Sequence, residues 1–465
     1  MSSHNAYFTD YTLISGDEAK RLRKVSEKIQ NGETDVIILG QEDDESRRKE
    51  PEPIRLVDYI GGKEYTQQYV GVIWDEAKGE TILLRSRFDG EDGFFTNYVL
   101  SRALGVSGAY FPDMRPQLAQ NQMAEWLLAL VFMGQIRDAQ RQGLYRAYRN
   151  DERNDSSPRG RIDIARHIRQ NPLLSNGKIA YTVRERSLDN PVNRVIVAAY
   201  SALEKKHRSL MRTLENNNRA AKEAIDRLKR DVSVPSRQEL TGLLRRRAEK
   251  INSPLYKQWE TVRRTAEMIL RHTTPEVAKG SAFEMGGVLV DMNTMWELYL
   301  EAVLRKMVPE GQMLSAQEKY YILLPGVEKP GKRTCEPDFW WKRGDDTVLI
   351  ADAKYKNSWS KIANKATKEK DLNEAWQDVR ADVFQVLSYM YTTGCSQGVI
   401  ICPVSGDLRE ENIFNVSAQR KDDKFHVIGL PIPQAYNDYD DFQEKMKDFE
   451  DTHVKKIKEC LKSAQ

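Results

Sequence analysis

The stretch that decides the fold covers residues 335–356 and reads CEPDFWWKRGDDTVLIADAKYK. Its second half contains the continuously apolar run VLIA, which is typical of a buried central strand. The turn-like sequence RGDD can fold the first half back beside this strand as a hairpin. Side chains alternate along a strand, so Asp352 and Lys354 point to one face, and the hairpin brings Asp338 close to them. A buried strand that ends in an acid and a lysine is costly unless these charges are paired or used.

These three side chains predict a nuclease site. Two convergent carboxylates, Asp338 and Asp352, bind a hard divalent cation such as Mg²⁺ or Mn²⁺. Lys354 can orient or activate water, or offset charge on a phosphorane-like transition state. P-D followed by D-x-K is the pattern of metal-dependent nucleases, although a bare match also fits an exposed hairpin with a surface ion pair. The apolar second strand and the flanking elements favour the nuclease interpretation.

Three further side chains are candidates for supporting roles. Gln385 and Tyr389 are four residues apart and therefore share one helix face, on a helix that follows the D-x-K strand. Upstream, Glu297 lies on a predicted helix and can supply another metal ligand, directly or through water; Glu301 is the alternative acid. The competing interpretations are a half-buried helix face for the first pair and a solvated helical acid for Glu297.

The fold class predicted for the chain is mixed α/β of the α+β type, with three domains. The first is a mixed α/β N-terminal domain over 1–150, and the second is a helical, basic middle region over 151–280. The third, 281–465, has the element order α-β-β-β-α-β, which predicts a mixed sheet flanked by helices. Its Trp340 and Trp341 are expected in the core, with stacking on a DNA base as the alternative.

The first domain contains several recognisable local patterns. A strand is expected over 7–14, and the capping box of Ser15 and Glu18 predicts a helix over about 16–30. The charged, apolar-free residues 41–53 predict a surface loop. TQQYVGVIWD and ETILLRSRF flank a turn and predict a hairpin, and a helix is expected over about 117–143.

The middle region carries the local excess of positive charge. Residues 150–160 are polar with Pro and Gly and predict an exposed connection, and GKIAYTVRER reads as a strand. The segment 201–270 is mostly helical and contains 17 Lys and Arg against 9 Asp and Glu, a difference of +8. This run is either a solvated helical face or a surface for DNA phosphates or for a protein partner.

Composition excludes several other classes of protein. The 465 residues are 40% hydrophobic, which excludes wholesale disorder, and 72 basic against 69 acidic residues give a net charge of only +3. No apolar run reaches the roughly 18 residues of a membrane span, and the N-terminus lacks signal-peptide features, so a cytoplasmic location is expected. The four cysteines form no C-x-x-C pair and the six histidines show no paired spacing, which argues against zinc chemistry.

One near-match to a phosphate-binding loop is rejected. Residues 326–333 resemble G-x-x-x-x-G-K-[ST], but Arg333 replaces the hydroxyl residue and Pro330 lacks a backbone N–H. The segment also joins two predicted strands, whereas that loop must open a helix. We therefore expect no NTP hydrolysis by this chain itself.

The assembled motifs resemble McrC, the nuclease subunit of McrBC-type modification-dependent restriction systems. In order and spacing, the similarity covers roughly 155–405. The shared segments are PRGRIDIARHI (158–168), Glu185 with Asp189-Asn190-Pro191 and Asn193-Arg194, Asp291-Met292-Asn293 with Trp296-Glu297 and Tyr299, Glu336-Pro337-Asp338, Asp352 to Lys356, and Asp382 to Gln385 with Tyr389. The first 150 residues match loosely, around YVGVIWD, and LLRSRFDG stands where the family usually has a proline-lysine element.

The resemblance implies a PD-(D/E)xK endonuclease fold, with Asp338, Asp352 and Lys354 as the catalytic core and Glu297 and Gln385 in support. It also implies a partner, a McrB-like AAA+ GTPase ring that is hexameric in such systems, on which the N-terminal half docks and whose hydrolysis it stimulates. The substrate implied is double-stranded DNA, modified in such systems. The alternatives are a non-catalytic adaptor that activates the ring, and a free-standing RecB-like nuclease.

Overall fold

The structure is a computed structural model that describes most of the chain. The described residues are 4–40, 53–75, 78–90, 92–105, 119–172, 176–245, 250–273, 285–308, 313–316, 320–323, 333–344, 346–364, 368–406, 411–416 and 422–463. The chain divides into two compact units, one formed by Met1–Ala124 with Met285–Gln465 and the other by Glu125–Glu284. The segments predicted as the first and third domains thus share one unit, and the three-part division stays a prediction.

The N-terminal part of the first unit is built on a five-stranded sheet in the order β1-β6-β5-β10-β2. Its strands are β1 (His4–Thr9), β6 (Glu80–Arg85), β5 (Tyr69–Asp75), β10 (Met285–Asp291) and β2 (Asp35–Leu39). The predicted hairpin is confirmed as the antiparallel pair β5–β6. Strand β10 has no counterpart among the predicted elements, and it pairs antiparallel with β5 and parallel with β2. A second hairpin is formed by β3 (Val57–Ile60) and β4 (Lys63–Thr66).

Helix α1 (Gly16–Gln30) begins and ends where the capping box predicts. The Glu18 carboxylate accepts a hydrogen bond from the backbone N–H of Ser15 at 3.1 Å, which satisfies a donor at the helix start. One face of α1, which includes Leu22, is buried in a hydrophobic core. Leu84 and Leu289 of the five-stranded sheet belong to the same core. Helix α2 (Phe94–Ala103) follows the hairpin and packs against α11 (Met292–Leu304), which begins directly after β10.

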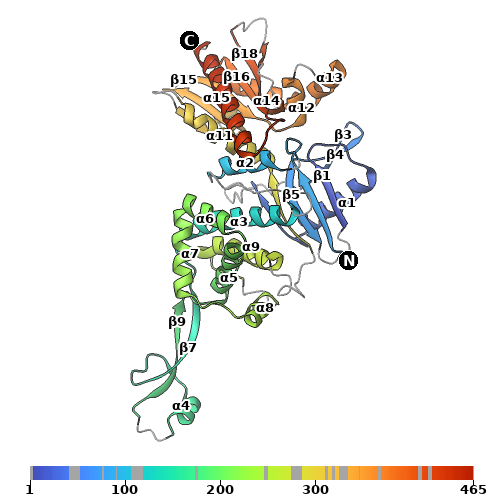
Figure 1. The fold of residues 1–465 in the computed structure, drawn as a ribbon. Coiled ribbons are helices and arrows are strands. Elements are labelled where there is room, and N and C mark those ends of the chain that lie inside the picture. Colours follow the sequence, from blue (N-terminus) through green and yellow to red (C-terminus); the bar gives the residue numbers. More distant parts are fainter. Residues whose placement is uncertain are drawn as a thin grey trace. The chain divides into compact units, whose positions relative to one another are not determined.

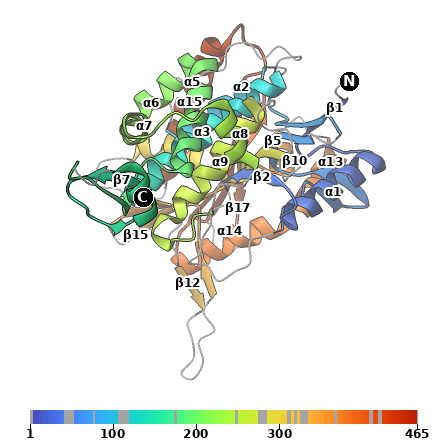
Figure 2. The same cartoon turned by 90° about the horizontal axis from the view of Figure 1, so that it is seen from below.

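The C-terminal part of the first unit is a six-stranded mixed sheet in the order β11-β14-β15-β16-β18-β17. Its strands β15, β16 and β18 are labelled in Figure 1, and β17 is labelled in Figure 2. Its strands are β11 (Met313–Ala316), β14 (Phe339–Arg343), β15 (Asp346–Ala353), β16 (Gln397–Ser405), β18 (Lys424–Ile432) and β17 (Glu411–Asn415). A separate pair joins β12 (Tyr320–Leu323) and β13 (Arg333–Cys335). The helices of this part are η2 (Arg305–Met307), α12 (Asn357–Ala363), α13 (Glu369–Asp378), α14 (Arg380–Thr393) and α15 (Tyr439–Ser463).

This sheet confirms the predicted mixed α/β class. Its central strands β15, β16 and β18 run parallel, and their apolar side chains are buried on both faces, as continuous apolar runs require. Trp340 and Trp341 of β14 are buried, as predicted. Helix α14 packs on β15 and β16. In the described part of the chain, no helix has the length and apolarity needed to cross a bilayer.

The second unit is mainly helical, as predicted for 201–270. Most of helix α3 (Ala119–Gln140) lies in it, followed by α5 (Pro191–Lys206), α6 (Arg208–Asn217), α7 (Arg219–Asp231), α8 (Arg237–Arg245), η1 (Pro254–Tyr256) and α9 (Lys257–Thr273). Its strands β7 (Ala147–Asp155), β9 (Ile179–Ser187) and β8 (Arg161–Ile162) form an antiparallel sheet in the order β7-β9-β8. Strands β7 and β9 form a long ribbon, with α4 (Ile164–Gln170) near its tip (Figure 1).

Three local predictions need correction. Residues 150–155 are strand and not an exposed connection, because β7 pairs with β9 over nine residues despite its polar sequence. The strand expected over 7–14 ends at Thr9, where the chain turns and Tyr11 takes a φ of 48°. The sequence DLNEAWQDVRADVFQVLSYMYTTG (371–394) predicts one helix carrying Gln385 and Tyr389, but it forms two, since Val379 leaves helical geometry at φ −93° and ψ 5° and is fully buried. The surface loop predicted at 41–53 lies outside the described residues except for its last residue. The segment 326–332, which joins two predicted strands, also lies outside them.

Candidate active site

The hairpin of β14 and β15 brings the two predicted aspartates together. The strands pair antiparallel with Phe339 opposite Ala351, so Asp338 lies just before β14 and opposite the end of β15. The Asp338 carboxylate accepts a hydrogen bond from the backbone N–H of Ala353 at 2.7 Å. Because Ala353 lies between Asp352 and Lys354, this bond fixes Asp338 beside both of them.

Lys354 is paired with Asp352 inside this site. Its Nζ lies 2.6 Å from Oδ2 of Asp352, whose side chain is only 1% exposed. The backbone N–H of Lys354 donates to the carbonyl of Ile401 on β16 at 2.9 Å, which extends the parallel pairing of β15 past its last strand residue. The D-x-K segment is thus held on one side by β14 and on the other by β16.

Helix α14 supplies the side chains predicted from Q-V-L-S-Y. Lys354 Nζ donates to Oε1 of Gln385 at 3.5 Å, and Gln385 Nε2 donates to the Tyr389 hydroxyl at 2.6 Å. The structure therefore brings Gln385 to the predicted site, and Tyr389 contacts Gln385 on the side away from the lysine. Tyr389 is buried, and the hydrogen bond from Gln385 joins it to the candidate site.

Glu297 on α11 contributes to the electrostatics of this site. Burial raises the pKa of Asp338 well above its ordinary value, and the negative charges of Asp352 and Glu297 raise this pKa further. The alternative acid, Glu301, instead pairs with Arg305 at 2.6 Å. Among the described residues, no three His, Cys, Asp or Glu side chains are grouped closely enough to form a metal site, so ligation by Glu297 stays a prediction.

The lysine carries a positive charge in this setting. Burial by itself would lower the pKa of Lys354, but the carboxylates of Asp352 and Asp338 outweigh burial and raise this pKa above its ordinary value. Lys354 is consequently an ammonium at neutral pH. In this state it can donate hydrogen bonds and offset negative charge.

A second ion pair, missing from the candidate residues, holds α14 on the D-x-K segment. Lys356 Nζ lies 3.0 Å from a carboxylate oxygen of Asp382, and the same carboxylate accepts a hydrogen bond from Trp359 Nε1 at 2.9 Å. Asp382 is buried and lies one turn before Gln385 on α14. The alternation of Lys354 and Lys356 along the chain was the sequence signal for this contact.

The residues present fit one divalent cation held by two carboxylates. Asp338 and Asp352 are close enough for the charge of one to raise the pKa of the other, so that two negative charges share a largely buried space. A bound cation relieves this repulsion directly, whereas Lys354 balances only part of it. Asp338 and Asp352 are the residues that would hold the ion.

The solved structures to which the chain is similar include two assemblies, and no curated protein matches the chain. The first is the "Refined half-complex from tetradecameric assembly of Thermococcus gammatolerans McrB AAA+ hexamers with bound McrC", with 17% identity, 97% of this chain and 99% of that chain covered, and a TM-score of 0.44. The second is the "Cryo-EM structure of the Thermococcus gammatolerans McrBC complex", with 17% identity, 66% and 88% covered, and a TM-score of 0.27.

The comparison with protein families is more specific. The family model described as "McrBC 5-methylcytosine restriction system component" matches residues 65–403, which is most of the chain. That range includes the whole of the site built from Glu297, Asp338, Asp352, Lys354 and Gln385. The chain therefore belongs to the McrBC 5-methylcytosine restriction system component family.

Proposed function

We propose that this protein is the nuclease subunit of an McrBC-type restriction system, a Mg²⁺- or Mn²⁺-dependent endonuclease that cuts double-stranded DNA. The observation that carries the proposal is the convergence of Asp338, Asp352 and Lys354 at the end of the β14–β15 hairpin. A purely structural site has no use for two buried carboxylates in mutual repulsion. Membership of a restriction-system family supports the same conclusion.

Each residue of the site has a role that follows from its contacts. Asp338 and Asp352 would hold the divalent cation, which when bound would polarise the scissile phosphate and make water more acidic. Lys354 lies beside both carboxylates, where its ammonium stabilises negative charge that develops on the phosphate. Gln385 holds the ammonium of Lys354 in place, and Tyr389 holds Gln385.

The proposal includes an AAA+ GTPase ring as partner, on which the N-terminal half of the chain docks. Near the tip of the β7–β9 ribbon, Ile162, Ile164 and Ile168 are 49%, 69% and 62% exposed. Ile164 and Ile168 are four residues apart on α4 and therefore lie on one face. Exposed apolar side chains grouped in this way are typical of a protein–protein contact.

The test of the active site is cleavage by single variants of the full chain in complex with its AAA+ partner. We expect Asp338→Ala, Asp352→Ala and Lys354→Ala to lower the cleavage rate at least about 10²–10³-fold, because the first two remove a carboxylate that would hold the cation and the third removes the positive charge that offsets charge on the phosphate. Asp346→Ala is the matched control, since Asp346 lies at the opposite, exposed end of the same strand. Wild-type cleavage by any of the three variants would refute the assignment of its residue.

The same preparation separates this function from its two alternatives. A nuclease subunit gives strand scission that stops on chelation and returns with Mg²⁺ or Mn²⁺. An adaptor stimulates GTP hydrolysis by the ring but gives no metal-dependent scission. A free-standing nuclease cuts DNA at its full rate before any NTPase subunit is added, whereas the proposed subunit requires the ring.

A further inference from the structure

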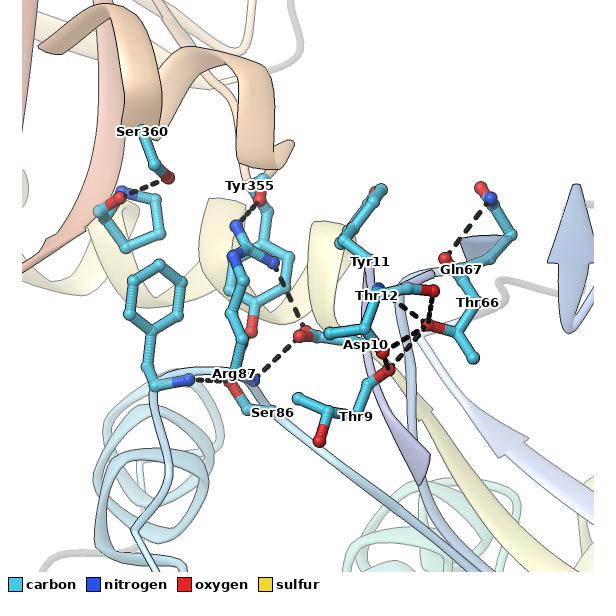
Figure 3. A network of polar contacts seen from close by, with 12 residues as sticks. Thr9, Asp10, Tyr11, Thr12, Thr66, Gln67, Ser86, Arg87, Tyr355 and Ser360 are labelled. Carbon is cyan, nitrogen blue, oxygen red and sulfur yellow. Dashed lines mark hydrogen bonds and ion pairs between the residues drawn. The ribbon is translucent and has the colours of Figure 1, made fainter. Parts of the chain in front are cut away.

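Tyr355, the residue directly after Lys354, is held by residues of the N-terminal sheet (Figure 3). The guanidinium of Arg87, just past the end of β6, donates a hydrogen bond to the backbone carbonyl of Tyr355. Asp10, just past the end of β1, holds Arg87 in turn. Its carboxylate accepts a hydrogen bond from the backbone N–H of Arg87 at 2.7 Å and lies 3.4 Å from Nη1 of the side chain.

The side chain of Tyr355 is fixed as firmly as its backbone. Its hydroxyl lies 2.6 Å from Oγ of Ser86, and its ring is fully buried. The Arg87 guanidinium lies 4.5 Å from the centre of the Tyr355 ring and 4.5 Å from that of Phe88, within the range of cation–π attraction. Tyr355 is therefore held at its carbonyl, ring and hydroxyl by two consecutive residues, Ser86 and Arg87.

The same network extends to the helix that carries Glu297. Tyr11, whose ring centre is 5.0 Å from the Arg87 guanidinium, donates a hydrogen bond from its hydroxyl to Asn293 Oδ1 at 3.3 Å. Asn293 lies one turn before Glu297 on α11. Among the described residues, Tyr11 is the single non-glycine residue with a positive φ, at 48°. Backbone strain of this kind persists only where the surroundings fix the residue, and it concentrates at functional sites.

Stability alone gives a poor account of this network. The Asp10 side chain is fully buried and that of Arg87 is 11% exposed, so both ions have lost most of their hydration. Replacing such a pair by apolar residues is often neutral or stabilising, so a buried ion pair is weak evidence for a contribution to stability. The pair instead fixes the orientation of the Arg87 side chain. Its planar guanidinium can donate hydrogen bonds to two acceptors at once.

We propose that Arg87, held by Asp10, is a positioning residue of the nuclease site. By fixing the backbone at Tyr355, it sets Lys354 and Asp352 relative to Glu297 on α11. The inference rests on the proposed nuclease function and adds residues from the opposite end of the sequence. It also makes the N-terminal sheet part of the cleavage machinery, since movement of the ends of β1 and β6 changes the geometry of the D-x-K segment.

The test compares Arg87→Gln with Arg85→Gln in the full chain bound to its AAA+ partner. Arg85 is the matched control, because it ends strand β6 and its guanidinium lies over the half-exposed ring of Tyr7, away from Tyr355. We expect Arg87→Gln to lower kcat about 10²-fold, the effect of displacing a reacting group by about 1 Å, while KM for DNA stays unchanged. The Mg²⁺ concentration for half-maximal cleavage should rise, because Asp352 moves with Lys354. Arg85→Gln should match wild type in all three.

Two further variants keep this test decisive. Arg87→Lys retains the charge beside Asp10 but not the planar fork, so we expect partial recovery of kcat. Asp10→Asn has nearly the same volume and should lower kcat like Arg87→Gln. Thermal unfolding of each variant shows whether it is folded at the assay temperature. A loss of activity that only follows the unfolded fraction, or unfolding of all three variants, would make the network merely structural and overturn the proposal.

The variant Asp352→Ala, measured in the same assay, distinguishes failure of the proposed nuclease function from failure of the positioning role of Arg87. If Asp352→Ala cleaves like wild type, the proposed nuclease function itself fails. If Asp352→Ala is inactive while Arg87→Gln and Asp10→Asn cleave at the wild-type rate, the nuclease function stands and only the positioning role is refuted.

Discussion

At the scale of single residues, Asp338 is the acid of the site whose charged form is most disfavoured in the folded protein. Burial, then the charges of Asp352 and Glu297, raise its pKa well above the ordinary value of 3.8. In the unfolded chain those causes are absent. As the pH rises, the carboxyl group of Asp338 therefore loses its proton at a lower pH in the unfolded state than in the folded state. Below the ordinary value both states are protonated and Asp338 has no effect, but above it each rise in pH disfavours the folded state until the raised value is passed.

Asp338→Asn should therefore stabilise the metal-free protein. We expect a higher melting temperature than wild type at neutral pH in EDTA, with a difference that shrinks as the pH falls toward 4, because asparagine cannot ionise. Thermal unfolding across this pH range measures the effect, and Asp346→Asn, at an exposed position on β15, controls for the loss of one charge. Equal melting temperatures for wild type and Asp338→Asn at neutral pH would contradict the assigned repulsion.

At the scale of elements, strand β10 connects the N-terminal sheet to the active site. It lies between β5 and β2, and the next residues begin α11, which carries Glu297. Gly71 on β5 makes this arrangement possible. Its φ is +147°, and a Cβ added there would lie 2.1 Å from the carbonyl oxygen of Val288 on β10. No side chain fits at this position without moving one strand away from the other.

Gly71→Ala should weaken the fold at this crossing. We expect a loss of about 3 kcal/mol in the free energy of unfolding from overpacking against the β10 backbone, in addition to the unfavourable φ. Gly79→Ala is the matched control, since Gly79 also has a positive φ, of +64°, but has open space where a Cβ would lie. It should lose only about 1–2 kcal/mol. Urea unfolding of both variants decides the matter, and equal losses would show that the contact with β10 is unimportant.

At the scale of the whole molecule, the helical unit has its own buried ionic centre. The Glu125 side chain is 1% exposed and contacts Lys206, His207 and, at 3.4 Å, Nδ1 of His272. Burial by itself would raise the pKa of Glu125, but hydrogen bonds from His207, His272 and Lys206 outweigh it and lower this pKa. Helices α3, α5 and α9 and the turn before α6 thus share one carboxylate within the unit 125–284.

Glu125→Gln should destabilise this unit. We expect a loss of about 1–3 kcal/mol in the free energy of unfolding, because Lys206, His207 and His272 lose the charged acceptor that they share. The stabilisation exists above the ordinary pKa of 4.5 and is lost as the pH falls toward the lowered value, so the gap to wild type closes in acid. Hydrogen exchange of the backbone amides of 125–284 measures this loss of stability. Glu223→Gln is the control, because Glu223 forms an exposed pair with Arg219. Unchanged protection would refute the role of Glu125.

From the sequence alone, several local elements could be predicted, among them α1 and the β5–β6 hairpin, and so could the proximity of Asp338, Asp352, Lys354 and Gln385. The capping box set the start of α1, and the spacing of Asp338, Asp352 and Lys354 around one turn brought them together, because these contacts form between residues close along the chain. Gln385 followed from helical periodicity. Only the tertiary structure decided that β10 joins the N-terminal sheet and that Arg87 holds Tyr355, 268 residues away. Such contacts depend on which distant surfaces pack together, and nothing in the local pattern around Arg87 or Gly71 encodes that choice.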